Sequence, residues 1–396
     1  MRSWWLARLP RVLSQAQVKR SSDRPSGTDV FTSPVVAPEL SLSAVPSMRL
    51  LILADADGPT QKISFLRPLR PLIDTGSAIV QLVDEAQVAE GGTAFAERVW
   101  RQVAPTALVL SRYGGGLESP FVKAARATRT PIIYHIDDNL FEVPKTLGPA
   151  KYSRYNDPKR LADMTAAVEA TDLVYASTDE LARQLRERFS DKRVIAGAIY
   201  CAHKARVTGV SAKSGPVTIG YMGTSGHLHD LELVVPALVS LLEECPDLRF
   251  ETFGTIKMPA ALKRFQGRVA HHDAISDYEA FIDKLARLGW HVGLAPLTDG
   301  RFNACKADTK WAEYTAAGIP VVASNLPVYH KACAEGGGLL VGQREWKAAL
   351  AAVVESSELR DSLVSRAQKR LASDYKPENL ERQLLDVLEL AHRSEH

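Results

Sequence analysis

The segment EYTAAGIPVVAS, residues 313–324, joins the end of a helix to the start of a strand. Its first part is typical of a helical turn that begins at Glu313 and ends at Gly318, and the apolar run IPVVAS follows directly. The small residues of the Ala-Ala-Gly turn allow this helix to pack closely against the strand. A helix that leads straight into a buried strand indicates an α/β unit with a parallel sheet.

Apolar runs with the length of buried strands recur along the chain from Met48, and helical patterns separate them. This alternation predicts successive βαβ units. We expect strands at 48–56, 78–84, 107–111, 131–137, 173–177 and 193–199, and again at 216–223, 248–254, 267–273, 291–297, 319–325 and 338–342. We expect helices at 63–74, 92–103, 120–128, 159–170, 179–189, 230–245, 277–289 and 378–393. The predicted fold class is therefore α/β, with two tandem doubly wound Rossmann-like domains.

A polar stretch at 203–215 interrupts the alternation and divides the chain. We expect a leader over 1–47, a first domain over 48–205, a second domain over 206–376 and a C-terminal helix over 377–396. Ligands of doubly wound sheets bind beyond the carboxyl ends of the strands. The cleft between the two domains is therefore the expected site.

The composition of the 396-residue chain excludes several classes of protein. Its four cysteines form no CxxC pair, which excludes a disulfide scaffold and a spacing-defined zinc site and favours a reducing compartment. No apolar run approaches the roughly 18 residues that a membrane-spanning helix needs. The formal charge of +3 lies wholly in the leader, which holds six basic and three acidic residues. Because the remaining chain is neutral, it lacks the basic face of a nucleic-acid binder, and we expect no nucleic-acid partner.

The leader has three interpretations. Residues 2–20 have the pattern of a basic amphipathic helix with a Trp-Trp-Leu anchor at 4–6, and such a helix can lie in a membrane interface. An Arg-rich start with few acidic residues also resembles a transit peptide, and a plain disordered tail ahead of Met48 is the third interpretation. We expect a cytoplasmic protein, with peripheral contact at the inner face of the membrane through residues 1–20 as one option.

Two stretches of the predicted second domain suit a nucleotide. Glu313 faces the expected cleft, where its carboxylate can accept two hydrogen bonds from a ribose diol. In IGYMGTSGHLHDL, residues 219–231, a buried strand runs into Gly223 and Thr224 and then into a helix. Glycine lets backbone N–H groups approach a phosphate, and a helix N-terminus supplies positive potential. The alternatives are a solvated charged helix over 306–314 and a plain turn in the loop.

The first of these stretches resembles the donor site of GT-B glycosyltransferases, in particular the family 4-like nucleotide-sugar enzymes with a Glu-x7-Glu motif. In that family the second Glu binds the donor ribose, and Glu313 stands at its position, five residues before Gly318. The first Glu of the family contacts the donor sugar and is tied to a retaining reaction, and Cys305 stands at that position here. The wider segment GLAPLTDGRFNACKADTKWAEY, residues 293–314, is similar to bacterial surface-polysaccharide enzymes in which APL, FN, K and K-x2-E recur.

The resemblance implies a set of donor-binding residues. Lys306 is expected to meet the pyrophosphate, since its ammonium is a point charge suited to phosphate. Lys310 lies one helical turn before Glu313 and can pair with it or with phosphate. His227 can donate to a phosphate oxygen, and Asp230 can cap the helix or orient a histidine. The full predicted set is Gly223, Thr224, His227, Asp230, Asn303, Lys306, Lys310 and Glu313.

The predicted first domain carries YHIDDNLFEVP, residues 134–144, at the carboxyl end of a strand. His135 or Asp137 can hold an acceptor hydroxyl and act as general base, with Asp138 beside them. The paired carboxylates also suit a divalent metal ion, and strand-end capping by Asp and Asn is the third interpretation. Asp57 and Gly58, in the loop after the first strand, are expected on the acceptor side.

The resemblance therefore implies a glycosyltransferase that moves a sugar from a nucleoside diphosphate sugar to a hydroxyl of a glycan or lipid-linked acceptor. Its catalytic residues would be His135, Asp137, Asp138 and Lys306. The leaving pyrophosphate needs charge stabilisation, and basic side chains and backbone amides can supply it without a metal or cofactor. Two alternatives remain, a sugar-nucleotide epimerase and a non-catalytic partner subunit, and Cys305 in place of the first Glu favours the second of them.

Overall fold

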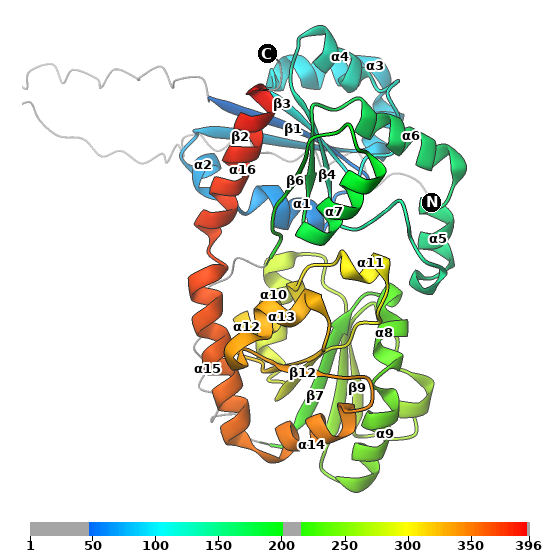
Figure 1. Cartoon of the computed structure of the whole chain (residues 1–396), viewed down its shortest axis with the longest axis vertical. Coiled ribbons are helices and arrows are strands. Elements are labelled where there is room, and N and C mark those ends of the chain that lie inside the picture. The colour runs from blue at the N-terminus through cyan, green and yellow to red at the C-terminus, as the bar shows by residue number, and fades with distance from the viewer. Residues whose placement is uncertain (1–46, 201–214, 394–396) are drawn as a thin grey trace, which may run out of the picture. The chain divides into compact units, whose positions relative to one another are not determined.

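The computed structural model describes residues 47–200 and 215–393, and it confirms an α/β fold with two six-stranded parallel sheets (Figure 1). Both sheets belong to one compact unit, residues 46–396. The predictions for residues 1–20 concern a segment that lies outside the described residues. Within the described ranges, none of the helices combines the length and the apolar character that a membrane crossing requires.

The first sheet has the strand order β2-β1-β3-β4-β5-β6. Its strands are β1 (Met48–Ala54), β2 (Ala78–Asp84), β3 (Ala107–Ser111), β4 (Ile132–Ile136), β5 (Leu173–Ala176) and β6 (Val194–Ala196). The connecting helices are α1 (Pro59–Gln61), η1 (Lys62–Leu66), α2 (Arg70–Asp74), α3 (Glu85–Val103), α4 (Pro120–Ala127), η2 (Lys145–Leu147), α5 (Pro149–Tyr155), α6 (Pro158–Glu169) and α7 (Asp179–Arg188).

The second sheet has the order β12-β11-β10-β7-β8-β9. Its strands are β7 (Thr218–Gly223), β8 (Arg249–Gly254), β9 (Val269–Asp273), β10 (Val292–Ala295), β11 (Val321–Ser324) and β12 (Leu339–Val341). The helices are η4 (Ser225–His227), α8 (Leu228–Glu232), α9 (Val235–Glu244), η5 (Ala260–Leu262), α10 (Tyr278–Arg287), α11 (Arg301–Ala304), α12 (Thr309–Ala316), α13 (Pro327–Cys333), η6 (Ala334–Gly336), α14 (Trp346–Glu355), α15 (Ser357–Asp374) and α16 (Pro377–His392).

The strands of the first sheet are apolar along their whole length because both faces of the sheet are covered. In β1, Leu51 and Leu53 pack in one core cluster, while Leu50 and Ile52 pack in another. Successive side chains of a strand point to opposite faces, so the two clusters lie on the two sides of the sheet. One cluster contains residues of α4, α6 and α7, and the other contains residues of η1 and α16.

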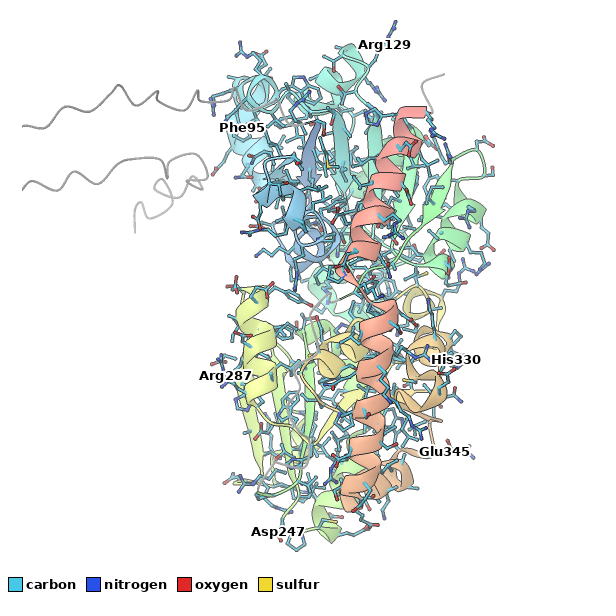
Figure 2. The ribbon with its side chains drawn as sticks, turned by 90° about the vertical axis from the view of Figure 1, so that its left-hand side faces the viewer. Phe95, Arg129, Asp247, Arg287, His330 and Glu345 are labelled. Carbon is cyan, nitrogen blue, oxygen red and sulfur yellow. The ribbon has the colours of Figure 1, made fainter. Side chains whose placement is uncertain are left out.

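The last helix, α16, packs against the first sheet although it follows the second sheet in the chain (Figures 1 and 2). Its residues Leu384, Val387, Leu388 and Ala391 are buried in the core cluster that also holds Leu50 and Ile52. Gln383 donates from Nε2 to the backbone oxygen of Ala198 at 3.0 Å. The chain therefore crosses from the first half to the second and returns through α15 and α16.

All twelve predicted strands are present, whereas several helices differ from the prediction, and α13, α14 and α15 were not predicted. α3 begins at Glu85, where Asp84 caps it by accepting from the backbone N of Gln87 at 2.8 Å, and it is kinked at Gly92, the residue at which the predicted helix begins. The Gln87 side chain accepts from the backbone N of Asp84 in return, which completes a capping box. The helix α5 has no counterpart in the prediction.

The helix before β11 is longer than predicted, because α12 begins at Thr309 and Glu313 lies in its middle. Its end is as expected from the Ala-Ala-Gly turn. Gly318 has a left-handed φ of +71° and donates to the carbonyl of Thr315 at 3.0 Å, and Ile319 donates to that of Tyr314 at 2.9 Å. These two bonds satisfy the last carbonyls of the helix in a Schellman motif.

Replacing Gly318 by Ala is expected to lower the free energy of unfolding by about 1–2 kcal/mol, since an L side chain is strained in the left-handed region. The unfolding midpoint in urea measures this loss. Gly58→Ala is the matched control, because Gly58 has an extended φ of −141° and an added Cβ meets only ordinary contacts. Equal midpoints for the two variants would contradict the prediction.

Candidate functional site

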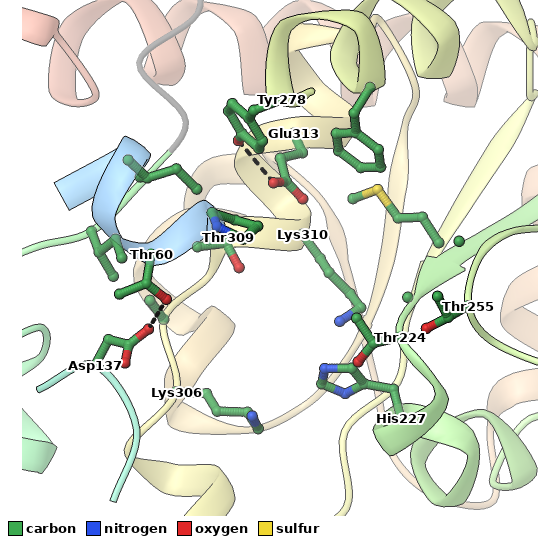
Figure 3. A pocket seen from close by; sticks show the side chains of 18 of the residues that line it. Thr60, Asp137, Thr224, His227, Thr255, Tyr278, Lys306, Thr309, Lys310 and Glu313 are labelled. Atoms are coloured by element: carbon green, nitrogen blue, oxygen red, sulfur yellow. Dashed lines mark hydrogen bonds between the residues drawn. The ribbon is translucent and has the colours of Figure 1, made fainter. Parts of the chain in front are cut away.

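A pocket of about 400 Å³ is lined by residues of both halves of the chain (Figure 3). The lining residues follow the carboxyl ends of β3 and β4 in the first sheet and of β7, β8 and β9 in the second. This is where ligands of doubly wound sheets bind. Eight of the predicted site residues line it, namely Asp137, Asp138, Gly223, Thr224, His227, Lys306, Lys310 and Glu313.

The loop after β7 provides the backbone side of the pocket. It runs from Gly223 through Thr224 into η4, and the backbone N of Ser225 donates to Oγ1 of Thr255 at 3.0 Å. Gly254 at the end of the neighbouring β8 approaches closely, since a Cβ there would lie 2.3 Å from the carbonyl oxygen of Gly223. The ends of β7 and β8 therefore form one compact edge. We call residues 223–226, which follow β7, the 223–226 loop.

Two lysines point into the pocket near this loop (Figure 3). The ammonium of Lys306 lies 3.3 Å from Oδ1 of Asp138, which joins the two halves of the chain through an ion pair. Burial opposes the ionisation of Asp138, but Lys306 and Arg112 outweigh it and hold its pKa at about 2. Burial and the nearby Lys306 lower the pKa of Lys310 to about 8. Among the described residues, Lys310 has a cation–π contact with Tyr221 and no carboxylate partner.

His227 is held by Asp230 and accepts, rather than donates, on its pocket side. Nδ1 of His227 lies 3.0 Å from Oδ2 of Asp230, whose Oδ1 accepts from the backbone N and Oγ1 of Thr298, both at 2.9 Å. Lys310 and burial lower the pKa of His227 to about 3, so the ring is neutral near pH 7. Because ionised Asp230 can only accept, the neutral ring keeps its proton on Nδ1 and donates it to Asp230 in a hydrogen bond, so Nε2 carries the lone pair. We predicted that His227 donates a hydrogen bond to a phosphate oxygen. The neutral ring has no proton on Nε2, so this contact requires a protonated His227.

Of the two roles predicted for Asp230, the structure shows the one of orienting a histidine. Asp230 lies inside α8 rather than at its N-cap, and the N-cap residue His227 makes no side-chain cap hydrogen bond. Asn303, also predicted at the donor site, does not line the pocket. It donates to the carbonyl of Thr298 at 2.9 Å and so supports the loop that holds Asp230.

Glu313 is placed by α12 on the side of the pocket formed by α10. Its Oε1 accepts from the Tyr278 hydroxyl at 2.8 Å (Figure 3), and within the described ranges Oε2 has no hydrogen-bond partner. Burial raises the pKa of Glu313 to about 7. The helix over 306–314 is therefore not a solvated charged helix, because its Lys310 and Glu313 both face the pocket.

On the first sheet, Asp137 belongs to a charged network in the pocket wall. It accepts from the Thr60 hydroxyl at 2.8 Å and from Arg112 at 3.1 Å. The Arg112 guanidinium also lies 3.4 Å from Asp55, and its backbone adopts a left-handed φ of +56°. Such strain is tolerated where surrounding contacts fix the residue, and here two carboxylates hold the guanidinium.

The metal interpretation of the paired carboxylates finds no donor set. Asp137 and Asp138 each have a cationic partner, Arg112 and Lys306. In residues 47–200 and 215–393, no group of three or more His, Cys, Asp or Glu side chains is arranged to hold a metal ion.

Several predicted residues lie away from the pocket, and His135 is the main correction. Its side chain is buried between Phe65 and Tyr175, with Nδ1 3.0 Å from Oγ of Ser111. Burial lowers its pKa to about 4. The reason is the end of the strand: His135 lies inside β4 and packs against Phe65 and Tyr175, whereas Asp137 follows the last residue of β4 and lines the pocket.

Asp57, Gly58 and Cys305 also contribute no side chain to the pocket lining. The pocket begins one residue later in the loop, at Pro59 and Thr60. The Cys305 thiol is fully buried, donates to the carbonyl of Arg301 at 3.4 Å, and has a pKa raised to about 12 by burial. A thiol in this state is inert.

Thr60, Arg112, Lys151 and Tyr278 are among the pocket residues that were absent from the predicted set. Arg112 directly follows β3, and Thr60 lies in α1, the first helix after β1. A position after the carboxyl end of a strand is a signal that could have identified both as site residues. Lys151 belongs to the unpredicted α5, and Tyr278 reaches Glu313 from a separate helix. The sequence pattern near them gives no indication of those contacts.

No protein-family model matches the chain, and no characterised protein sequence matches it either. Solved structures of the same two-domain GT-B fold do match. Anabaena Alr3699/HepE in complex with UDP and glucose is 14% identical with a TM-score of 0.59, and the match covers 86% of this chain and 99% of that one. A UDP-forming α,α-trehalose-phosphate synthase from Burkholderia xenovorans is 13% identical with a TM-score of 0.55, over 86% and 99%. Staphylococcus aureus TarM in complex with fondaparinux, α-GlcNAc-glycerol and UDP is 10% identical with a TM-score of 0.55, over 75% and 58%. At these identities the likeness shows the fold.

Proposed function

We propose that this chain is a glycosyltransferase that moves a sugar from a nucleoside diphosphate sugar to a hydroxyl of a glycan or lipid-linked acceptor. The observation that carries the proposal is one pocket in which Lys306, Lys310 and the 223–226 loop lie beside Glu313. Ammonium groups and backbone N–H groups suit a diphosphate, and a carboxylate suits a ribose diol. We propose UDP as the nucleotide, because the structures of HepE and TarM hold it and the synthase is named UDP-forming.

In the proposed reaction the bond between the anomeric carbon of the sugar and the diphosphate breaks, and a bond to the acceptor oxygen forms. The diphosphate leaves with negative charge, which Lys306 and Lys310 stabilise without reorganisation because the fold already places them there. We assign the acceptor hydroxyl and its proton to Asp137, which lines the pocket from the first sheet. His135, the other candidate, is out of reach.

The finer parts of the proposal follow the sequence resemblance. We propose a retaining reaction in surface-polysaccharide synthesis, with no metal because ammonium groups supply the positive charge, and peripheral membrane contact through the leader. The stereochemistry of the product, determined by NMR, tests the retaining reaction. Turnover in the presence of EDTA tests whether a metal is needed. Liposome binding before and after deletion of residues 1–47 tests the membrane contact, and equal binding would reject it.

The central test is incubation of the protein with a panel of nucleotide sugars, with and without glycan acceptors. Release of free nucleotide that depends on an acceptor supports the transferase. A new nucleotide sugar formed without acceptor would instead identify an epimerase, and binding without turnover a partner subunit. If calorimetry detects no nucleotide binding, the transferase and the epimerase are both wrong.

The affinity for UDP-glucose is expected to pass through an optimum between about pH 7 and 8. Below this range Glu313, whose pKa is raised to about 7, takes up a proton and accepts ribose hydroxyls less well. Above it Lys310, whose pKa is lowered to about 8, loses the charge that attracts phosphate. Calorimetric titrations from pH 6 to 9 measure the profile. The acid limb should disappear in Glu313→Gln and the alkaline limb in Lys310→Met, and a flat wild-type profile would contradict the assignment.

A further inference from the structure

A lysine of the first half, Lys151 in α5, reaches the 223–226 loop of the second half. A Cβ built on Gly226 would lie 3.4 Å from the Lys151 ammonium and 3.4 Å from the carbonyl oxygen of Leu147. The neighbouring η2 packs against η4 and α8, so the whole 145–151 segment lies along the loop. Lys151 also lines the pocket, at its solvent-exposed side.

Lys151 has no counterion of its own. Within the parts of the chain that the structure describes, no hydrogen bond or ion pair joins it to a carboxylate, whereas Lys306 is paired with Asp138. Partial burial lowers the pKa of Lys151, and the charges of Lys306 and Arg112 add to this effect against the opposing charge of Asp138. A cation held among other cations without a partner is a site for an anion.

The pocket lining holds more cations than carboxylates. Its cations are Arg112, Lys151, Lys306 and Lys310, and its carboxylates are Asp137, Asp138 and Glu313. Arg112 is held between Asp55 and Asp137, and Lys306 is paired with Asp138. This leaves Lys151 and Lys310 as the cations available to an anionic ligand such as a phosphate.

The two available lysines approach the pocket from different sides. Lys310 lies in α12, one helical turn before Glu313, the proposed ribose ligand. Lys151 instead reaches Gly226 in the 223–226 loop from the first half of the chain. A nucleotide with its ribose at Glu313 would therefore present its α-phosphate to Lys310 and its β-phosphate towards Lys151.

We propose that Lys151 binds the β-phosphate of the nucleotide sugar, from the half of the chain opposite to Lys310. This rests on the proposed function and adds to it a contact by which the donor bridges the two halves. A β-phosphate contact strengthens as charge develops on the leaving diphosphate, so Lys151 acts on turnover as well as on binding.

The experiment compares UDP with UMP, which lacks the β-phosphate, by calorimetry at low ionic strength. Lys151→Gln is expected to weaken UDP binding about tenfold and to leave UMP binding unchanged, and Lys151→Arg should restore most of the loss. Lys310→Gln should weaken both ligands. Lys145→Gln is the matched control, since Lys145 lies in the same segment but sits over the Tyr152 ring and does not line the pocket.

The outcomes separate the inference from the proposed function. If wild-type protein binds UDP and Lys151→Gln binds it equally well, or if UDP and UMP lose affinity equally, the β-phosphate assignment is wrong while the transferase stands. If wild-type protein binds neither nucleotide, both are wrong. Thermal melting of each variant shows that a loss of affinity is not a loss of folded protein.

Discussion

Lys306→Ala is expected to lower turnover of the nucleotide sugar by about 10²–10³-fold, the cost of removing one preorganised group that stabilises a developing negative charge. Lys306 lines the pocket from the loop that precedes α12, where its ammonium can meet the diphosphate of the proposed donor. The loss should appear mainly in kcat, because the charge grows as the bond to the sugar breaks. Initial rates with a saturating acceptor measure it.

A structural explanation of that loss is separable from the catalytic one. The Lys306 side chain also pairs with Asp138 at 3.3 Å, so its removal leaves a half-buried carboxylate without its partner. In the double variant Lys306→Ala/Asp138→Asn this unpaired charge is absent. If activity returns in the double variant, the ion pair and not the phosphate contact explains the effect. Lys347→Ala, which removes a surface ion pair with Glu244, is the control and should leave turnover unchanged.

Glu313→Ala is expected to weaken UDP binding by about 10–100-fold, because hydrogen bonds to a charged group contribute about 1.5–3 kcal/mol. Glu313 lines the pocket, and its Oε1 is held by Tyr278, which fixes the carboxylate before the ligand arrives. Tyr278→Phe should therefore have a smaller effect in the same direction. Calorimetry with UDP measures both variants.

The ribose contact itself is tested with 2′-deoxy-UDP. Wild-type protein should prefer UDP over the deoxy analogue, and Glu313→Ala should bind the two about equally. If Glu313→Ala keeps the full preference for UDP over 2′-deoxy-UDP, another group binds the ribose hydroxyl. Unchanged UDP affinity in Glu313→Ala would mean that the ribose lies elsewhere in the pocket.

The fold was predictable from the sequence because its signals are local. Each buried strand is a short apolar run, and Gly318 ends its helix by a bond pattern that depends on neighbouring residues only. The presence of Lys306, Lys310 and Glu313 in one pocket was predictable for the same reason, since the three lie within eight residues on one loop and helix.

The parts that were not predicted depend on distant segments or on which face of a strand a residue occupies. His135 lies in a strand whose two faces are both buried, so the apolar pattern has no alternation that would reveal its direction. The bond from Thr298 to Asp230 joins residues that only the folded sheet brings together. Lys151 depends on α5, a seven-residue helix that is too short for a clear periodic pattern.

The return of α16 to the first sheet has a consequence for dividing this protein. Residues 48–200, produced alone, would leave uncovered the apolar surface of β1, β3 and β5 that Leu384, Val387, Leu388 and Ala391 otherwise cover. A fragment with such a surface self-associates. The two sheets are therefore not interchangeable modules. A chimera that exchanges the second half of the chain for that of another protein must keep its own residues 377–392, and a split version of the protein would reassemble only when that helix is supplied in trans.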